Sequence, residues 1–270
     1  MSAPRLPATA VSLNDRGLAY GDGLFETLRA HHGRLPFLPY HLNRLRNGLE
    51  RLDLEADLEA VAAHLQDRAI GQAQALIKLL LVRNVGRRGY APDGRSCWYH
   101  AVCYPLPAVR DRGEGIRVAC AALRLGLQPA LAGIKHLSRL EQVLAAREQR
   151  EKGVDELWIA DSAGYLVSGV QSNVLLVQDQ RVLAPPLDQC GVAGTTRAWA
   201  LDHLRRQGVP VVEQPVLLEQ ALEVEAACMT SAAQGVMAVG RVGARVLDVA
   251  HPLIRALQQA WQARLCGQPG

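Results

Sequence analysis

A stretch of turn-forming residues divides this chain into two regions that differ in their helix and strand patterns. Residues 105–115 contain two prolines and two glycines, a composition typical of a linker because neither residue type continues a helix or strand well. Longer helical and strand patterns precede it, and short β-branched segments follow it closely. A chain of 270 residues can build two cores. We therefore predict a small N-terminal α+β domain at 1–107, a linker at 108–114 and a larger, β-rich C-terminal domain at 115–270.

Hydrophobic periodicity predicts the elements of each domain. In the N-terminal domain it indicates helices at about 38–52 and 57–67, and strands at about 23–30, 75–83 and 96–104. In the C-terminal domain it indicates strands at about 116–122, 156–160, 165–167 and 174–178, and helices at about 139–152, 194–208 and 252–265. Leu140, Val143 and Leu144 are expected to face the core. The fold class is α+β, with helices packed outside the strands.

Charge and cysteine content argue against several classes of protein. The net charge is only +4, and the arginines are dispersed among acids, which argues against nucleic acid as the main partner. The six cysteines form neither a CxxC pair nor a zinc-ligand spacing with histidine, so they are expected to be small buried side chains in a reducing compartment. No apolar run is long enough to span a membrane, and the first residues lack a signal-peptide core. We expect a cytoplasmic protein with no metal site and no membrane partner.

Lysine is scarce in this chain. Lysine and arginine together number 30, and only Lys78, Lys135 and Lys152 are lysines. A lysine amine becomes a nucleophile when burial or a nearby cation lowers its pKa, whereas arginine stays charged. Lys135 lies between an apolar stretch and a predicted helix start. Two interpretations are open at this point: Lys135 performs amine chemistry, or it is a surface lysine in a chain whose genome favours arginine codons.

Two segments contain groups that could bind an anion. The turn at 194–197, Gly-Thr-Thr-Arg, opens a predicted helix. Its backbone N–H groups, two hydroxyls and helix dipole suit a phosphate, although the same residues are ordinary N-caps. Arg44 lies beside the apolar stripe of its predicted helix. It is either a solvated side chain or a phosphate ligand supplied from another element.

Two glycine-containing loops have less specific chemistry. The segment 83–90 combines three arginines, among them Arg88, with Tyr90. It could bind a carboxylate, or it could be a positively charged loop without a ligand. The segment 13–27 contains three glycines before a predicted strand. Glycine there indicates close backbone approach or positive φ, and names no ligand.

Taken in order, these segments resemble the fold-type IV PLP-dependent enzymes, which include aminodeoxychorismate lyases and the branched-chain and D-amino-acid aminotransferases. The resemblance extends over nearly the whole chain, through residues 15–27, the sequence His-Leu-Asn-Arg-Leu at 41–45, Lys135, the turn at 194–197 and the loop at 229–236. It implies that pyridoxal 5'-phosphate is the cofactor and that Lys135 forms the Schiff base and then acts as base and acid. The other cofactor-binding residues that it implies are Arg44, Ser168, Asn173, Gly194, Thr195, Thr196 and Ser231.

Three segments are most similar to the lyase branch of this family. They are residues 131–145 around Lys135, the Arg-Gly-Tyr sequence at 88–90, and residues 187–192. A lyase of this kind converts 4-amino-4-deoxychorismate, a small anionic substrate, to 4-aminobenzoate and pyruvate in folate biosynthesis. The resemblance also implies that Arg88 and Tyr90 bind a substrate carboxylate and that the enzyme is a homodimer.

One position departs from the family pattern. The family usually has a glutamate that faces the pyridine nitrogen of PLP, five residues before an asparagine. This chain keeps Asn173 but has Ser168 in place of the glutamate, and no acid lies between Asp161 and Asp179. A carboxylate holds a proton on the ring nitrogen and strengthens PLP as an electron sink, which a hydroxyl does not do. Two alternatives to the lyase are therefore open: a fold-type IV aminotransferase, and a PLP-binding protein with impaired catalysis.

Overall fold

The chain forms two compact units. A computed structural model describes residues 12–86, 89–107 and 113–268. The first unit comprises Met1–Pro107 with Ile134–Arg139, and the second comprises Ala108–Gly133 with Leu140–Gly270. The short segment that carries Lys135 thus belongs to the first unit, although it lies far along the sequence. The domain boundaries at 107 and 115 stay a prediction, and the predicted linker lies largely outside the described residues.

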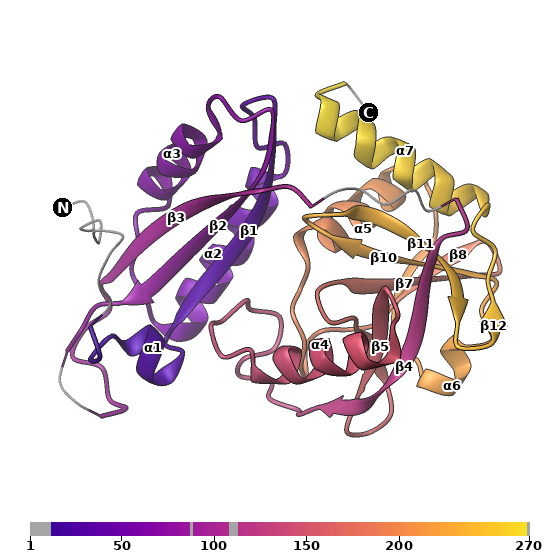
Figure 1. Cartoon of the computed structure of the whole chain (residues 1–270), viewed down its shortest axis with the longest axis horizontal. Coiled ribbons are helices and arrows are strands. Elements are labelled where there is room, and N and C mark those ends of the chain that lie inside the picture. Colours follow the sequence, from indigo (N-terminus) through magenta and orange to yellow (C-terminus); the bar gives the residue numbers. More distant parts are fainter. Residues whose placement is uncertain (1–11, 87–88, 108–112, 269–270) are drawn as a thin grey trace. The chain divides into compact units, whose positions relative to one another are not determined.

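The first unit is a three-stranded antiparallel sheet with helices (Figure 1). Its strands β1 (Gly23–His31), β2 (Gln74–Arg83) and β3 (Cys97–Pro105) pair in the order β1-β2-β3. A short helix α1 (Arg16–Tyr20) precedes β1. Helix α2 (Leu38–Leu52) packs on β1, and α3 (Leu58–Ala69) packs on β2 and β3.

Burial of alternate strand residues against a helical stripe holds this unit together. Leu24 and Leu28 of β1 are almost fully buried, as expected for one face of a strand. The stripe of α2 includes the buried Leu45 and Leu49, as its periodicity predicts. The side chain of Asp57 caps α3 by accepting from two backbone N–H groups at 3.0 Å.

The second unit is a nine-stranded sheet with four helices. Its strand order is β6-β5-β4-β11-β10-β7-β8-β9, with β12 paired to β11. The pairs β4–β5, β4–β11 and β8–β9 are parallel, and the others are antiparallel. The strands are β4 (Ile116–Leu125), β5 (Glu156–Asp161), β6 (Leu166–Ser168), β7 (Asn173–Gln178), β8 (Arg181–Ala184), β9 (Val211–Glu213), β10 (Ala226–Ser231), β11 (Gly235–Val242) and β12 (Arg245–Val246). The helices are α4 (Leu140–Lys152), α5 (Thr195–Arg206), α6 (Leu218–Ala221) and α7 (Pro252–Cys266).

The structure confirms the α+β class and adds elements that the sequence did not indicate. The predicted helices and strands are present, with ends that differ by a few residues. The missed elements are α1, α6 and β8 to β12. Strands β10 and β11 are buried on both faces, and β10 contains mainly small side chains. Such strands show no alternation of polar and apolar residues, so periodicity does not reveal them.

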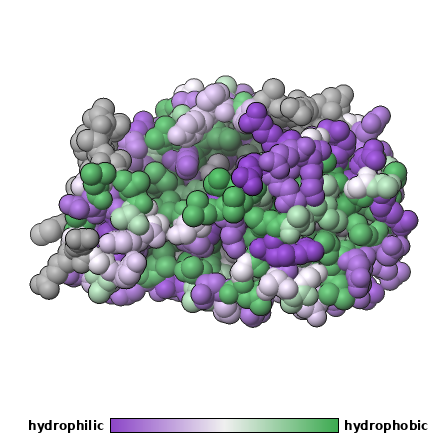
Figure 2. Space-filling view, turned by 60° about the horizontal axis from the view of Figure 1, so that its bottom comes forward, coloured by the Kyte–Doolittle hydropathy of each residue, from purple (hydrophilic) through white to green (hydrophobic). Residues whose placement is uncertain are grey.

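The prediction that Leu140, Val143 and Leu144 face the core is wrong. They are 77%, 61% and 49% exposed, and Figure 2 shows hydrophobic residues interspersed with hydrophilic ones over the visible surface. Helix α4 instead directs carboxylates at β4. Glu148 accepts from the N–H groups of Ala122 and Leu123 at 2.6 and 3.2 Å, where the pairing of β4 with β5 is irregular. These hydrogen bonds attach α4 to β4 through a polar residue, while the apolar side chains at 140, 143 and 144 remain exposed.

Two smaller expectations concern the whole chain. All six cysteines are free thiols; Cys97, Cys190 and Cys228 are buried and the others are partly exposed. Over the described ranges, no helix combines the length and the apolar character needed to cross a bilayer.

Gly23 gives a test of the packing at the start of β1. A Cβ at this position would lie 2.4 Å from the Leu81 carbonyl oxygen and 2.9 Å from Leu137 Cδ1. Because the first neighbour is strand backbone, Gly23→Ala should lower the free energy of unfolding by about 1–3 kcal/mol. In the control Gly113→Ala, the new Cβ meets nothing within 4 Å, so we expect a change below about 0.5 kcal/mol. Equal urea midpoints for the two variants would contradict this account.

Candidate active site

Backbone hydrogen bonds attach the Lys135 segment to β1. The N–H of Phe25 donates to the Lys135 carbonyl at 3.0 Å, and the N–H of Leu137 donates to the Gly23 carbonyl at 3.0 Å. A β-bridge joins Leu24 and His136 between them. The Lys135 Nζ lies 4.3 Å from the centroid of the Phe25 ring. The position of Lys135 is therefore set by the strand beside it.

A buried carboxylate next to Phe25 organises the charges around this lysine. Glu26 is 1% exposed. Its Oε2 lies 2.6 Å from His41 Nδ1, and its Oε1 accepts from Arg44 Nε at 2.8 Å. A second nitrogen of Arg44 also pairs with this carboxylate. His41 and Arg44 are three residues apart on α2, so they lie on one face of that helix.

The partners of Glu26 determine its charge and that of His41. Burial alone would raise the pKa of Glu26, but Arg44 and His41 outweigh burial and lower its pKa to about 2. Glu26 is therefore anionic at neutral pH. Burial lowers the pKa of His41, although Glu26 opposes that shift. A neutral His41 ring then donates its Nδ1–H to Glu26.

The same surroundings make Lys135 an unusual amine. Burial lowers its pKa, Arg44 lowers it further, and Glu26 opposes both, so that the pKa is about 7. Part of the Lys135 residue is still accessible to solvent. A substantial neutral fraction at physiological pH is what a nucleophile or an acid–base catalyst needs.

His136 is not a second acid–base group of this kind. Its Nε2 pairs with the guanidinium of Arg139. Burial and then Arg139 lower the pKa of His136 to about 4. The ring is thus neutral at pH 7, with its acceptor nitrogen occupied, in agreement with a structural role.

In the second unit, Asn173 connects several of the predicted cofactor residues. It opens β7 and is paired with Thr230 of β10, the residue before Ser231. Its Nδ2 donates to the Val192 carbonyl at 2.9 Å. A Cβ on Gly194 would lie 2.0 Å from the Asn173 Oδ1. Only glycine fits there, so Asn173 fixes the backbone immediately before α5.

The start of α5 has the form of an anion site. Gly194 is the N-cap residue and has no side chain with which to accept a hydrogen bond from the first turn. Thr195 and Thr196, the first helical residues, are 3% and 2% exposed. The N-terminal N–H groups and the positive end of the helix dipole favour a phosphate at such a position. This donor set fits the phosphate group of PLP.

A second buried carboxylate, missed by the sequence reasoning, lies near Ser168. Ser168 ends β6, is buried, and donates to the Gly169 carbonyl at 3.0 Å. Glu156 accepts from the Val170 N–H at 2.8 Å and from Ser172 Oγ at 2.6 Å. Its carboxylate supports the turn between Ser168 and Asn173. The sequence contains a signal for it, because Glu156 begins an otherwise apolar predicted strand, but it precedes Ser168 by twelve residues and only the fold brings it to the turn at 170–172.

The remaining predicted site residues are Ser231, Tyr90 and Arg88. Ser231 Oγ accepts from the Gln234 N–H at 3.1 Å, within the turn after β10. Tyr90 is 86% exposed, and Arg88 lies outside the described residues. Lys135 and Arg44 belong to the first unit, whereas Asn173 and the turn before α5 belong to the second. No cluster of three or more potential metal ligands occurs within the described part of the chain.

Comparison with known proteins agrees with this donor set. The class IV aminotransferase family matches residues 23–242. The chain belongs to this family. As a class IV aminotransferase family member, it is 30% identical over 262 residues to an aminodeoxychorismate lyase of Vibrio harveyi, with 92% of this chain and 93% of the relative covered. It is also 30% identical to a putative branched-chain-amino-acid aminotransferase of Methanocaldococcus jannaschii, covering 88% and 84% of the two chains.

A solved structure gives a more similar relative. The 4-amino-4-deoxychorismate lyase of Pseudomonas aeruginosa is 38% identical, with a TM-score of 0.89 and 96% of each chain covered. Enzymes of the class IV family depend on PLP, which agrees with the lysine, arginine and helix N-terminus described above.

Replacing Glu26 tests how the neighbouring charges determine the pKa of Lys135. Because Glu26 raises the pKa of Lys135, Glu26→Gln should move that pKa from about 7 to a lower value. Acylation of Lys135 in the cofactor-free protein, followed by mass spectrometry across pH, reports this midpoint. The variant also removes the buried carboxylate that pairs with Arg44 and His41, so stability should fall by about 3–5 kcal/mol.

The matched control is Glu50→Gln, on the exposed side of the same helix α2. It should change neither the midpoint nor the stability appreciably. An upward shift of the Lys135 midpoint in Glu26→Gln would contradict the assigned role of Glu26.

Proposed function

We propose that this chain is a PLP-dependent carbon–oxygen lyase that converts 4-amino-4-deoxychorismate to 4-aminobenzoate and pyruvate in folate biosynthesis. The observation that carries the proposal is Lys135, a lysine with a pKa of about 7 that Arg44 helps to lower, on a segment hydrogen-bonded to strand β1. The similarity to lyases from Vibrio harveyi and Pseudomonas aeruginosa over more than nine-tenths of the chain supports the substrate.

The resemblance to the family assigns the residues that would bind the cofactor. Lys135 would bind PLP covalently through Nζ, and Arg44 would contact its phosphate. In the second unit, the phosphate would be bound by the turn at Gly194 with Thr195 and Thr196, and by Ser231, while Asn173 fixes that turn. Bound PLP supplies electron withdrawal from the carbon that bears the substrate amine.

Lys135 then performs the proton transfers. Its Nζ, once released from the cofactor, would remove the proton from the amine-bearing carbon of the substrate and return a proton as the enolpyruvyl group leaves. A pKa of about 7 suits both tasks, because such a group accepts and donates protons readily at neutral pH. Loss of the leaving group aromatises the ring of the product.

Ser168 favours the lyase over an aminotransferase. The similarity to branched-chain and D-alanine aminotransferases keeps the second reaction as the alternative. Transamination depends strongly on the electron sink that a carboxylate at position 168 would reinforce. Glu156, the nearby acid, already accepts hydrogen bonds from the turn at 170–172. An elimination that ends in an aromatic ring has less need of that carboxylate, and a catalytically impaired PLP-binding protein is the remaining alternative.

Three further properties belong to this proposal. Arg88 and Tyr90 would bind a carboxylate of the anionic substrate. The enzyme would be a homodimer, as its resemblance to the family implies. It would act in the cytoplasm, where the six free thiols would stay reduced.

Borohydride reduction of the holoenzyme tests the central residue. We expect one pyridoxyl group on Lys135, whose pKa is lowered to about 7, and none on the exposed Lys78 or Lys152. Mass mapping locates the label, and formation of 4-aminobenzoate from 4-amino-4-deoxychorismate measures the activity. Lys135→Arg should abolish both, whereas Lys152→Arg should retain both. A label on another lysine would overturn the proposal; a label on Lys135 without turnover would leave the silent PLP-binding protein.

Ser168→Glu tests the electron sink. A new carboxylate at this buried position should increase keto-acid formation from D-alanine or L-leucine by about ten- to hundredfold, since a hydrogen bond to a charged group contributes about 1.5–3 kcal/mol. The control Ser168→Gln introduces a side chain of the same size as Ser168→Glu but without the charge. It should therefore give no such increase in keto-acid formation. Equal rates for the two variants would show that position 168 does not face the pyridine nitrogen.

A further inference from the structure

The segment Asp15–Thr27 contacts two other parts of the first unit. From the sequence alone, its glycines and charged residues do not identify a ligand. On one side it carries the Lys135 segment. Gly23 accepts from the Leu137 N–H, and Phe25 donates to the Lys135 carbonyl, both at 3.0 Å. These bonds follow directly after Asp22 in the chain.

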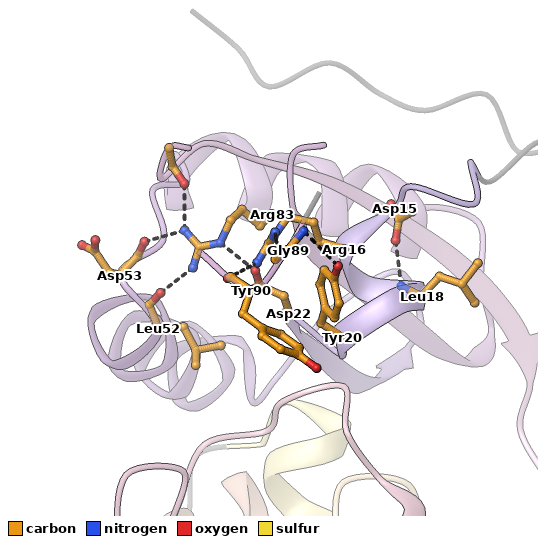
Figure 3. Close-up of polar contacts among 11 residues, drawn as sticks. Asp15, Arg16, Leu18, Tyr20, Asp22, Leu52, Asp53, Arg83, Gly89 and Tyr90 are labelled. Atoms are coloured by element: carbon orange, nitrogen blue, oxygen red, sulfur yellow. Dashed lines mark hydrogen bonds and ion pairs between the residues drawn. The ribbon is translucent and has the colours of Figure 1, made fainter. Parts of the chain in front are cut away.

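On its other side, the segment holds the loop between β2 and β3. Arg16 donates through Nη1 to the Gly89 carbonyl at 2.9 Å and through Nη2 to the Tyr90 carbonyl at 2.8 Å (Figure 3). Its Nε donates to Asp22 Oδ2 at 2.8 Å. The Arg16 side chain is only 5% exposed. Two nitrogens of one buried guanidinium thus join the segment to the loop, and the third holds the guanidinium against Asp22 of the same segment.

A second arginine fixes the same carboxylate from the strand side. Arg83 Nε donates to Asp22 Oδ2 at 2.8 Å. Its other nitrogens donate to the carbonyls of Leu52, Asp53 and Gly94 at 2.7 to 3.0 Å. Asp22 therefore lies between two arginines, and its position is determined by α1, by β2 and by the end of α2.

The aromatic contacts of the loop complete the attachment. The Gly89 N–H donates to the Tyr20 hydroxyl at 3.3 Å, and the rings of Tyr20 and Tyr90 are tilted with centroids 5.3 Å apart. Tyr90 nevertheless remains 86% exposed. A large side chain that is exposed, while its backbone is held by a buried arginine, contributes little to the core. Its attachment is suited to presenting the phenol to a ligand.

We propose that Arg16 is a positioning residue for substrate binding, and that it sets the place of Tyr90 relative to the Lys135 segment. The inference rests on the proposed function, in which Tyr90 contacts the substrate. Because Asp22 and Gly23 are consecutive, the hydrogen bonds that fix the loop and those that fix the lysine segment meet at adjacent residues. A shift of one relative to the other would require breaking several of them.

Arg16→Lys is the decisive variant. Lysine keeps the charge opposite Asp22, but it cannot direct separate N–H groups at two carbonyls. In the holoenzyme we expect KM for 4-amino-4-deoxychorismate and Kd for 4-aminobenzoate to rise about tenfold, the size of a lost preorganisation. The value of kcat should change less than about threefold, and the pH midpoint of Lys135 labelling in the cofactor-free protein should not move. Amide exchange in a peptide covering Gly89 and Tyr90 should accelerate.

Two comparisons separate positioning from a general structural role. Arg46→Lys, on the exposed side of α2, should leave all four measurements unchanged. Tyr90→Phe should raise KM on its own, and the double variant with Arg16→Lys should be less than additive if Arg16 acts through Tyr90. Additive effects, or a fall in kcat without a change in KM, would overturn the inference.

The proposed function and this inference fail in different ways. A wild-type enzyme that binds 4-aminobenzoate but does not turn over the substrate would refute the lyase, while the Kd and exchange measurements still decide the role of Arg16. A wild-type enzyme that binds neither molecule would refute both. Normal turnover with unchanged KM and unchanged exchange in Arg16→Lys would refute the inference alone.

Discussion

The first unit depends on two carboxylates at the start of β1, each of which is paired with two basic side chains. Asp22 lies between Arg16 and Arg83, and Glu26 lies between Arg44 and His41. A buried carboxylate that loses its partner is costly, by about 3–5 kcal/mol. The two pairs therefore tie α1, α2 and β2 to one short stretch of strand. The Lys135 segment is hydrogen-bonded to that stretch, which sets the position of the amine, while burial and then Arg44 lower its pKa.

In the second unit, the buried acid Glu156 stabilises a turn of the backbone. Glu156 accepts hydrogen bonds from the turn at 170–172, and Asn173, directly after that turn, determines the approach to α5. Ser168, before the turn, contributes a hydroxyl bonded to its neighbour's carbonyl. Under the proposed function, this unit would bind the phosphate of PLP at the start of α5 and would offer the pyridine ring only the hydroxyl of Ser168. This division favours elimination over transamination.

Much of the fold and part of the site follow from the sequence, because local patterns determine them. The helix at 38–52 was predicted with its observed ends from the spacing of its leucines, and Lys135 and Arg44 were recognised by motif. The orientation of α4 is not predictable from its apolar stripe. It depends on hydrogen bonds from two N–H groups of β4 to Glu148, and these groups lack a partner strand only once the sheet has formed. The roles of Glu26 and Arg16 also depend on distant partners: Glu26 pairs with side chains 15 and 18 residues away, and Arg16 donates to carbonyls 73 and 74 residues away. The attachment of the Lys135 segment to the first unit likewise depends on tertiary contacts, which local sequence patterns do not reveal.

The scarcity of lysine has a consequence for how the protein meets its cofactor. PLP is an aldehyde, and it condenses with any neutral amine that it encounters. The folded chain presents only three lysine amines, one of which, Lys152, is held by Glu148 and the Cys120 carbonyl. An arginine-rich surface carries the same positive charge without offering sites for such adducts. Assembly of the holoenzyme is thereby protected from wasteful side reactions, and Lys135 remains the amine at which condensation is productive.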